Sequence, residues 1–271
     1  MGIRTEDLEY HRPNGVPLLA RLYRPEGPGP FPGVLEVHGG AWTGGDRFNN
    51  TSIAEDLAAN GIVVLSIDFR MPPIAGYPDT VADVNFGIRF LKENAERFGT
   101  RADLVGGLGT SSGGHLLLLN ALRPRDPRYT AAATSSGIDA GLAFAVVCWP
   151  VADPLTRFRV MTERGNERLV AAHNLFWPSV ADMEEGSPQH ILDRNEAVAK
   201  PPMLIMQGTA DNNLTDDMAS RLTDSYRRIG GRITLEMFPG QPHAFIPAAP
   251  TAPDSVRALG LIKAFIRQTV G

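Results

Sequence analysis

The sequence is poor in cysteine, in charge of one sign and in long apolar runs. Cys148 is the only cysteine among 271 residues, which excludes a disulfide within the chain, and its apolar surroundings predict a buried, inert thiol. A net charge of −4 without a basic stripe argues against nucleic acid as a partner. No apolar run approaches the ~20 residues that span a membrane. The opening residues lack the apolar core of a secretory signal, so we expect a cytoplasmic protein that does not enter a membrane.

Strand-like and helix-like segments alternate along the chain, which predicts a parallel sheet with helices on both faces. The hydrophobic content of 43% and the length suit one domain over residues 1–271. We expect a hairpin of strands 8–11 and 18–24 around an Asn-Gly turn, and further strands at 33–37, 62–68, 104–108, 144–149, 202–206 and 233–238. We expect helices at 52–60, 80–98, 112–122, 216–229 and 254–269.

A serine lies between a short strand and a helix in the segment Gly109-Thr110-Ser111-Ser112-Gly113. Small residues two positions either side of a serine allow the sharp strand-to-helix turn that exposes a nucleophile above a sheet. The pattern alone is weak evidence because glycine and serine are common. It predicts Ser111 as a nucleophile only together with a base and an orienting acid.

Two later strands each end in a loop that carries a suitable partner. Asp211 follows the strand at 202–206, and His243 follows the strand at 233–238. The carboxyl ends of parallel strands meet at one edge of a sheet, and the order nucleophile, acid, base is typical of this turn. We therefore predict His243 as the general base and Asp211 as its orienting carboxylate.

The other acids and histidines are weaker candidates. Asp216 and Asp217 are expected in the first turn of a helix, where aspartate is favoured by the helix dipole. His115 opens the helix after the serine and is expected to point away from it. We expect surface roles for His173 and His190, which lie in a charged segment.

A glycine turn follows the strand at 33–37 and predicts an oxyanion hole. Glycine lets backbone N–H groups approach a ligand closely. We predict the N–H groups of Gly40, Ala41 and Ser112 as the donors, with Gly39 as a reserve that contacts substrate. His38 is expected to hold this loop by hydrogen bonds. Trp42 can be either core or a wall of the substrate pocket.

These motifs resemble the α/β-hydrolases, in particular carboxylesterases related to hormone-sensitive lipase and the feruloyl-esterase-like and kynurenine-formamidase-like enzymes. The resemblance rests on residues 38–42, 66–70, 77–78 with Asp83, 109–114, 208–211 and 239–243. It implies an eight-stranded, mostly parallel sheet and serine-dependent hydrolysis of carboxylic esters without a cofactor or metal. Ala41 departs from the third glycine of many relatives, and Thr110 and Ser112 replace the common aspartate and alanine, which leaves the substrate open.

Residues 151–199 interrupt the strand and helix alternation. They are rich in charge and carry scattered large apolar residues such as Phe176 and Trp177. We interpret them as a lid-like helical insert over the active site, with Trp177 as a substrate contact; the alternative is a surface excursion without a catalytic role.

Two further observations remain open in the sequence. Glu36 stands inside a predicted central strand, where a buried carboxylate needs a partner that the sequence does not identify. By analogy with the fold, an exposed C-terminal strand and helix could pair two subunits as a homodimer.

The leading hypothesis is an esterase for small to medium carboxylic esters that works through an acyl-enzyme. An amidase or formamidase with the same triad is the nearest alternative, because the same machinery cleaves an N-acyl bond. A catalytically idle ligand-binding homologue is an alternative of another class, since a fold does not fix a function.

Overall fold

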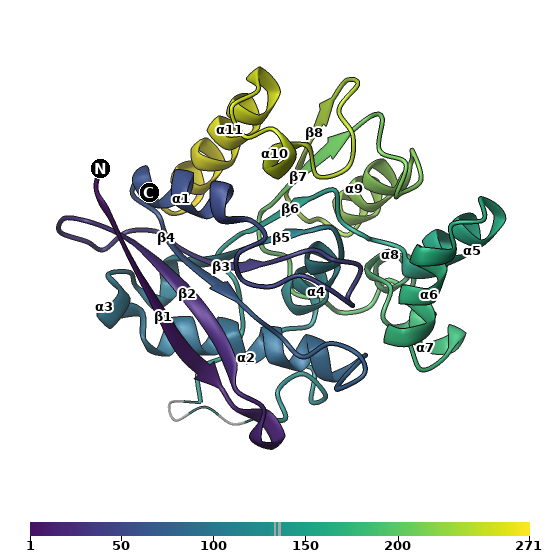
Figure 1. Cartoon of the computed structure of the whole chain (residues 1–271), viewed down its shortest axis with the longest axis horizontal. Coiled ribbons are helices and arrows are strands. Elements are labelled where there is room, and N and C mark those ends of the chain that lie inside the picture. Colours follow the sequence, from purple (N-terminus) through teal and green to yellow (C-terminus); the bar gives the residue numbers. More distant parts are fainter. Residues whose placement is uncertain (133, 135–136) are drawn as a thin grey trace.

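The computed structural model describes residues 1–132, 134 and 137–271, and its centre is one eight-stranded sheet (Figure 1). The order across the sheet is β1-β2-β4-β3-β5-β6-β7-β8. The first two strands are antiparallel to their neighbours, and all pairings from β4 to β8 are parallel. The strands are β1 Ile3–His11, β2 Leu18–Pro25, β3 Gly33–Val37, β4 Val63–Ile67, β5 Val105–Thr110, β6 Ala145–Cys148, β7 Met203–Gly208 and β8 Ile233–Phe238.

Helices cover both faces of this sheet. In Figure 1, α1 and α11 lie on one side, and α2, α3 and α4 lie on the other. Their bounds are α1 Thr51–Ala59, α2 Asp79–Glu93, α3 Ala95–Phe98, α4 Ser111–Leu122, α9 Met218–Arg228, α10 Phe245–Ala248 and α11 Pro253–Val270. Short 3-10 turns at Pro13–Gly15 and Ala102–Leu104 complete the described elements outside the segment 151–199.

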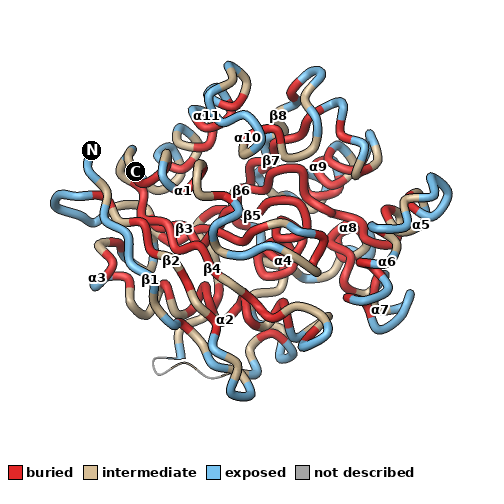
Figure 2. Tube along the Cα trace, in the orientation of Figure 1, coloured by how far each residue is buried: buried red, intermediate tan, exposed pale blue. Residues whose placement is uncertain are grey.

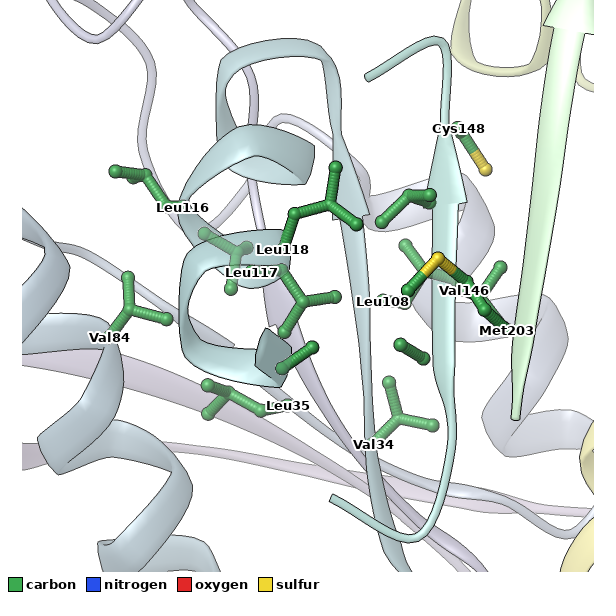
Figure 3. Close-up of a cluster of buried hydrophobic side chains, with 14 of the residues drawn as sticks. Val34, Leu35, Val84, Leu108, Leu116, Leu117, Leu118, Val146, Cys148 and Met203 are labelled. Carbon is green, nitrogen blue, oxygen red and sulfur yellow. The ribbon is translucent and has the colours of Figure 1, made fainter. Parts of the chain in front are cut away.

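The central strands are buried on both faces, as Figure 2 shows by their red colour. Two glycines of β5 let the neighbouring layers approach it closely. A Cβ at Gly106 would lie 2.4 Å from the ring of Phe144, and one at Gly107 would lie 2.5 Å from Leu117 of α4. Leucines of α4 therefore pack directly on the sheet in the core drawn in Figure 3.

The strand and helix pattern expected from the sequence is confirmed, with differences at element ends. β1 begins at Ile3, because its first residues pair with β2 although their side chains are mostly exposed. The helix expected at 80–98 is divided into α2 and α3 at Asn94, whose side chain bonds the carbonyl of Phe90. Cys148 is buried in β6, and burial raises the pKa of its thiol to about 12.

Glu36 of β3 is buried, and its partner is Asn50. The amide of Asn50 donates to Oε1 of Glu36 at 2.6 Å and to Oγ1 of Thr110 at 3.0 Å. Within the described residues, the second carboxyl oxygen of Glu36 has no hydrogen-bond partner. Burial therefore raises the pKa of Glu36 to about 7, and the polar side chains of Asn50 and Ser66 oppose this only in part.

The segment 151–199 forms short helices between β6 and β7. They are α5 Pro154–Glu163, α6 Glu167–Phe176, α7 Val180–Glu185 and α8 Pro188–Asp193. Each begins after a residue whose side chain accepts a hydrogen bond from the first turn, which explains why a charged segment is helical here. These capping residues are Asp153, Asn166, Ser179 and Ser187.

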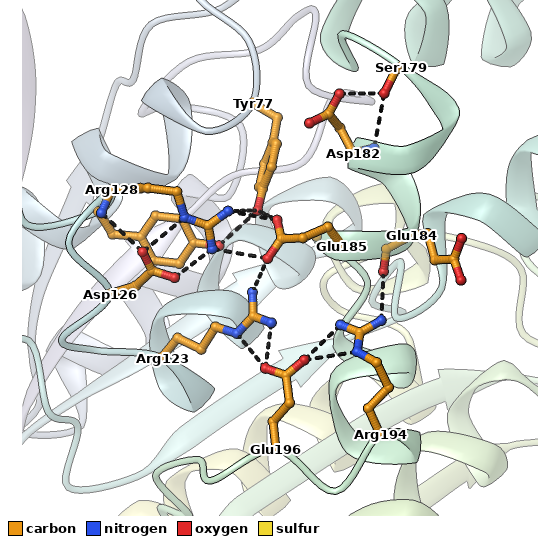
Figure 4. Close-up of polar contacts among 12 residues, drawn as sticks. Tyr77, Arg123, Asp126, Arg128, Ser179, Asp182, Glu184, Glu185, Arg194 and Glu196 are labelled. Atoms are coloured by element: carbon orange, nitrogen blue, oxygen red, sulfur yellow. Dashed lines mark hydrogen bonds and ion pairs between the residues drawn. The ribbon is translucent and has the colours of Figure 1, made fainter.

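An ion-pair network fixes α7 to the body of the molecule (Figure 4). Glu185 accepts from Arg123 at 2.6 Å and from Arg128 at 2.8 Å, and it also bonds the hydroxyl of Tyr77. Burial raises the pKa of Glu185, but the hydrogen bonds from Arg128, Tyr77 and Arg123 outweigh it and hold that pKa at about 2. One end of the insert is thus held in place by charge.

We predict that Glu185→Gln lowers the Tm at neutral pH by roughly 2–4 °C, because two arginines lose a counter-charge. A carboxyl whose pKa is depressed in the folded state contributes its full stability at pH values above its ordinary pKa of 4.5. The Tm difference between variant and wild type should therefore shrink as pH falls from 4.5 toward 2. Thermal melts across this range test the idea. Glu184→Gln, an exposed change on the same helix, is the control, and an equal effect of both variants would contradict the network's role.

We predict the opposite pH dependence for Glu36→Gln. A carboxyl with a raised pKa stabilises the fold fully below 4.5 and loses that contribution as pH rises through about 7. The variant should therefore melt several degrees above the wild type at pH well above 7, and close to it at acid pH. The exposed Glu163→Gln is the control for the same charge change. A variant that is less stable at alkaline pH would refute the buried-carboxylate account.

Candidate active site

Ser111 lies at the turn from β5 into α4 with a left-handed backbone, at φ 52°. Such a conformation is unfavourable for a residue with a Cβ and persists only where the surroundings enforce it. The two flanking glycines provide that enforcement. A Cβ at Gly113 would lie 2.2 Å from the carbonyl oxygens of Val37 and His38, and one at Gly109 would lie 2.7 Å from the carbonyl oxygen of Gly113. The turn is therefore as tight as the sequence pattern predicts.

The structure brings Ser111, His243 and Asp211 together from the ends of three strands. Nε2 of His243 lies 2.9 Å from Oγ of Ser111, and its Nδ1 lies 2.7 Å from Oδ2 of Asp211. Asp211 follows β7 and His243 follows β8, so the parallel sheet delivers all three to one edge. Both distances are within hydrogen-bond range.

Further hydrogen bonds hold Asp211 in its ionised form. Its oxygens accept from the amide of Gln207 at 3.1 Å and from the backbone N–H of Asn213 at 2.8 Å. Burial raises the pKa of Asp211, but the hydrogen bond and charge of His243 with these donors outweigh it, so the net shift is downward. Asp216 and Asp217 are exposed and do not bond His243.

The glycine turn after β3 presents unpaired donors beside Ser111. Gly40 and Ala41 both have positive φ, at 124° and 53°. Within the described residues, their N–H groups donate to no protein acceptor, in keeping with a role toward a ligand. Ser112 is in the first turn of α4, where N–H groups lack intrahelical partners. His38 is buried and bonds the carbonyl of Gly39 at 2.6 Å, which supports its predicted structural role.

A cavity of about 240 Å³ opens onto Ser111 and His243. Gly39, Gly40 and Ala41 contribute to its wall, as does Trp149 of the loop after β6. The sequence analysis missed the remaining polar lining, which comes from several separate segments. It consists of Asn49, Asn50, Thr110, Arg157, Arg168 and Asn213.

Trp42 and Trp177 do not line this cavity. Of the two alternatives for Trp42, the structure shows the core, and the substrate contact predicted for Trp177 is not seen. Both are buried in an aromatic cluster, with ring centroids 5.8 Å apart and Phe176 stacked on Trp42. The positive φ of Trp42 (62°) and the bond from its indole N–H to His115 direct it into the core.

His173, expected at the surface, is also buried in this aromatic cluster. It lies 5.0 Å from Trp42 between ring centroids, and burial lowers its pKa to about 4. The charged flanks of the segment obscured the apolar face on which it lies. His190 is only half-buried.

The described residues offer no group of three or more His, Cys, Asp or Glu side chains arranged to hold a metal ion. None of the described helices is both long and apolar enough to cross a membrane.

Comparison with known proteins agrees with this geometry. The sequence profile of the BD-FAE family matches residues 21–225. Esterase LipC of Mycobacterium tuberculosis is 29% identical over 235 residues, which are 83% of this chain and 56% of that protein. The probable carboxylic ester hydrolase LipM of the same organism is 27% identical, over 80% of this chain and 50% of its own length. The chain thus spans about half the length of these curated relatives.

Solved esterase structures share the fold. The propionate-bound Est2 esterase of Thermogutta terrifontis matches with a TM-score of 0.78 at 24% identity, over 97% of this chain and 94% of that one. The hyperthermophilic esterase of Pyrobaculum calidifontis gives a TM-score of 0.80 at 21% identity, over 99% and 87%. These likenesses confirm the predicted α/β-hydrolase fold. With a family profile that covers most of its length, the chain belongs to the BD-FAE family of the α/β-hydrolase superfamily.

Proposed function

We propose that the protein hydrolyses small carboxylic esters through an acyl-enzyme on Ser111. The observation that carries this proposal is the continuous hydrogen-bonded line from Ser111 through His243 to Asp211 at the mouth of a cavity. The names of the relatives support ester hydrolysis, and Est2 has propionate bound in one structure and butyrate in another.

In the first half-reaction, Oγ of Ser111 attacks the ester carbonyl carbon while its proton passes to Nε2 of His243. The negative charge that develops on the carbonyl oxygen is stabilised by the N–H groups of Gly40, Ala41 and Ser112. The tetrahedral intermediate then collapses, and His243 protonates the leaving alcohol. Asp211 keeps the imidazole oriented and stabilises its positive charge.

In the second half-reaction, water takes the place of the alcohol. His243 accepts a proton from the water, whose oxygen attacks the acyl carbon of the Ser111 ester. The same donors stabilise the second oxyanion. Its collapse releases the carboxylic acid and returns the proton to Ser111.

The insert 151–199 acts in this proposal as the wall that sets substrate shape. Arg157, Arg168 and Leu169 of the insert line the cavity, while Glu185 holds its other end to the body.

The sheet ends in β8 at the edge opposite β1. The pairing of two chains through this C-terminal edge stays a prediction.

We predict that Ser111→Ala lowers kcat on p-nitrophenyl esters by a factor on the order of 10³ or more, because no acyl-enzyme can form. The measurement is initial-rate hydrolysis of a panel from acetate to octanoate by wild type and variant, with circular dichroism to confirm folding. Retention of most activity in the variant would refute the assignment. Turnover of N-formyl or anilide substrates but of no ester would favour the amidase, and no turnover at all would favour an idle binding protein.

Asp211→Asn should also lower kcat steeply, since the histidine loses the acceptor that fixes its tautomer. Asp216→Asn is the matched control, because this neighbouring aspartate is exposed and lies outside the hydrogen-bonded line. The kcat values of both variants on the best ester of the panel show which aspartate orients the histidine. A larger loss in Asp216→Asn would show that the orienting acid is misassigned.

A further inference from the structure

Arg157 is a buried cation, two of whose guanidinium nitrogens meet no acceptor among the described residues. The side chain belongs to α5 of the insert and is only 2% exposed, yet it lines the cavity that opens onto Ser111. Within the described part of the chain, its Nε and Nη1 are buried and bond no acceptor. Burial lowers the pKa of Arg157 to about 10, which still leaves it charged at neutral pH. An unpaired buried charge is costly, so its retention calls for an explanation.

The neighbours of Arg157 do not neutralise it. Its guanidinium carbon lies 5.4 Å from the ring centroid of Trp42, a cation–π contact that tolerates the charge without satisfying its donors. His173, which also packs on Trp42, has a pKa of about 4 and is uncharged at neutral pH. Asp211 attracts Arg157 at a distance, but its oxygens already accept from His243, Gln207 and Asn213.

The rest of the cavity wall is also positively charged or neutral. A second guanidinium, that of the exposed Arg168, lines the cavity from α6. The other polar lining consists of amides, a hydroxyl, the serine and the histidine, and no carboxylate side chain lines this cavity in the described structure. The wall is therefore cationic and rich in hydrogen-bond donors, an unusual lining for a site that takes purely apolar acyl chains.

We infer that the substrate is a small ester that carries a carboxylate, with the carboxylate seated on Arg157 and assisted by Arg168. This inference rests on the proposed ester hydrolysis at Ser111 and adds the substrate class. A guanidinium presents its donors in a fork that matches a carboxylate, and charge-assisted hydrogen bonds are among the strong ones. The cavity of about 240 Å³ restricts this class to short molecules such as half-esters of small diacids.

The carboxylate could stand on either side of the ester bond, and two substrate pairs of matched shape separate the cases. Monomethyl succinate carries it on the acyl side, with methyl isocaproate as its neutral isostere. Acetoxyacetate carries it on the alcohol side, with isobutyl acetate as its neutral isostere. The rate of acid release, measured in a pH-stat, gives kcat/KM for each.

The wild type should favour the anionic member of at least one pair by tenfold or more. Arg157→Met should lower kcat/KM for that anionic ester by about 10- to 100-fold. It should change kcat/KM for the neutral isostere less than threefold. Arg168→Met should act in the same direction with a smaller effect, since Arg168 is exposed. Arg159→Met is the matched control, because Arg159 is an exposed arginine of the same helix that does not line the cavity.

Binding without turnover tests the inference separately from the proposed function. Ser111→Ala should bind the preferred anionic ester in a calorimetric titration, and the double variant Ser111→Ala with Arg157→Met should bind it at least tenfold more weakly. Arg157→Met should melt at or above the wild-type Tm, since it removes an unpaired buried charge.

Several results would overturn the inference. Wild-type preference for the neutral esters, with Arg157→Met leaving the ratio unchanged, would refute it while ester hydrolysis stood. An equal loss on anionic and neutral esters would assign Arg157 to support of Asp211 or of the fold. If no ester were hydrolysed but the titration showed Arg157-dependent binding, the proposed function would fail and the carboxylate site would stand.

Discussion

The close contact between the start of α4 and the end of β3 is the constraint on which the rest of the site depends. A Cβ at Gly113 would lie 2.2 Å from the carbonyl oxygens of Val37 and His38, so only a residue without a side chain fits there. Two residues before this contact, Ser111 takes a left-handed backbone at the turn from β5 into α4. The same contact brings the glycine turn at Gly39 to within reach of the serine.

The parallel sheet does the remaining assembly. The proposed oxyanion donors, the serine, the aspartate and the histidine come from the carboxyl ends of β3, β5, β7 and β8. Strand order and direction thus bring Ser111 and His243, which are 132 positions apart, to hydrogen-bond distance of each other.

Much of this was open to prediction from the sequence because it depends on local pattern and chain order. The strands, the glycines around Ser111 and the places of Asp211 and His243 after their strands are features that periodicity and spacing reveal. The partner of Glu36 was not predictable, because Asn50 reaches it from a different segment and amides carry no periodic signal. Likewise, Trp42 stands beside the glycine turn in sequence, but its backbone turns it into the core, a fact that composition cannot show.

In the insert 151–199, composition alone failed to predict which side chains are buried. Its many charges suggested a solvated surface, yet His173 and Arg157 are among its most buried side chains. Arg157 and Met161 are one helical turn apart and share the buried face of α5, so an arginine at an apolar-face position was the available signal.

The ion-pair network around Glu185 has a consequence for how this fold can change over evolution. It separates the insert into an end that is fixed to the body and an end, α5 and α6, that contributes side chains to the cavity. Ser111, Asp211 and His243 lie outside these two helices, after β5, β7 and β8. Replacements in α5 and α6 can therefore change the wall of the cavity while the hydrogen-bonded line from Ser111 to Asp211 is kept.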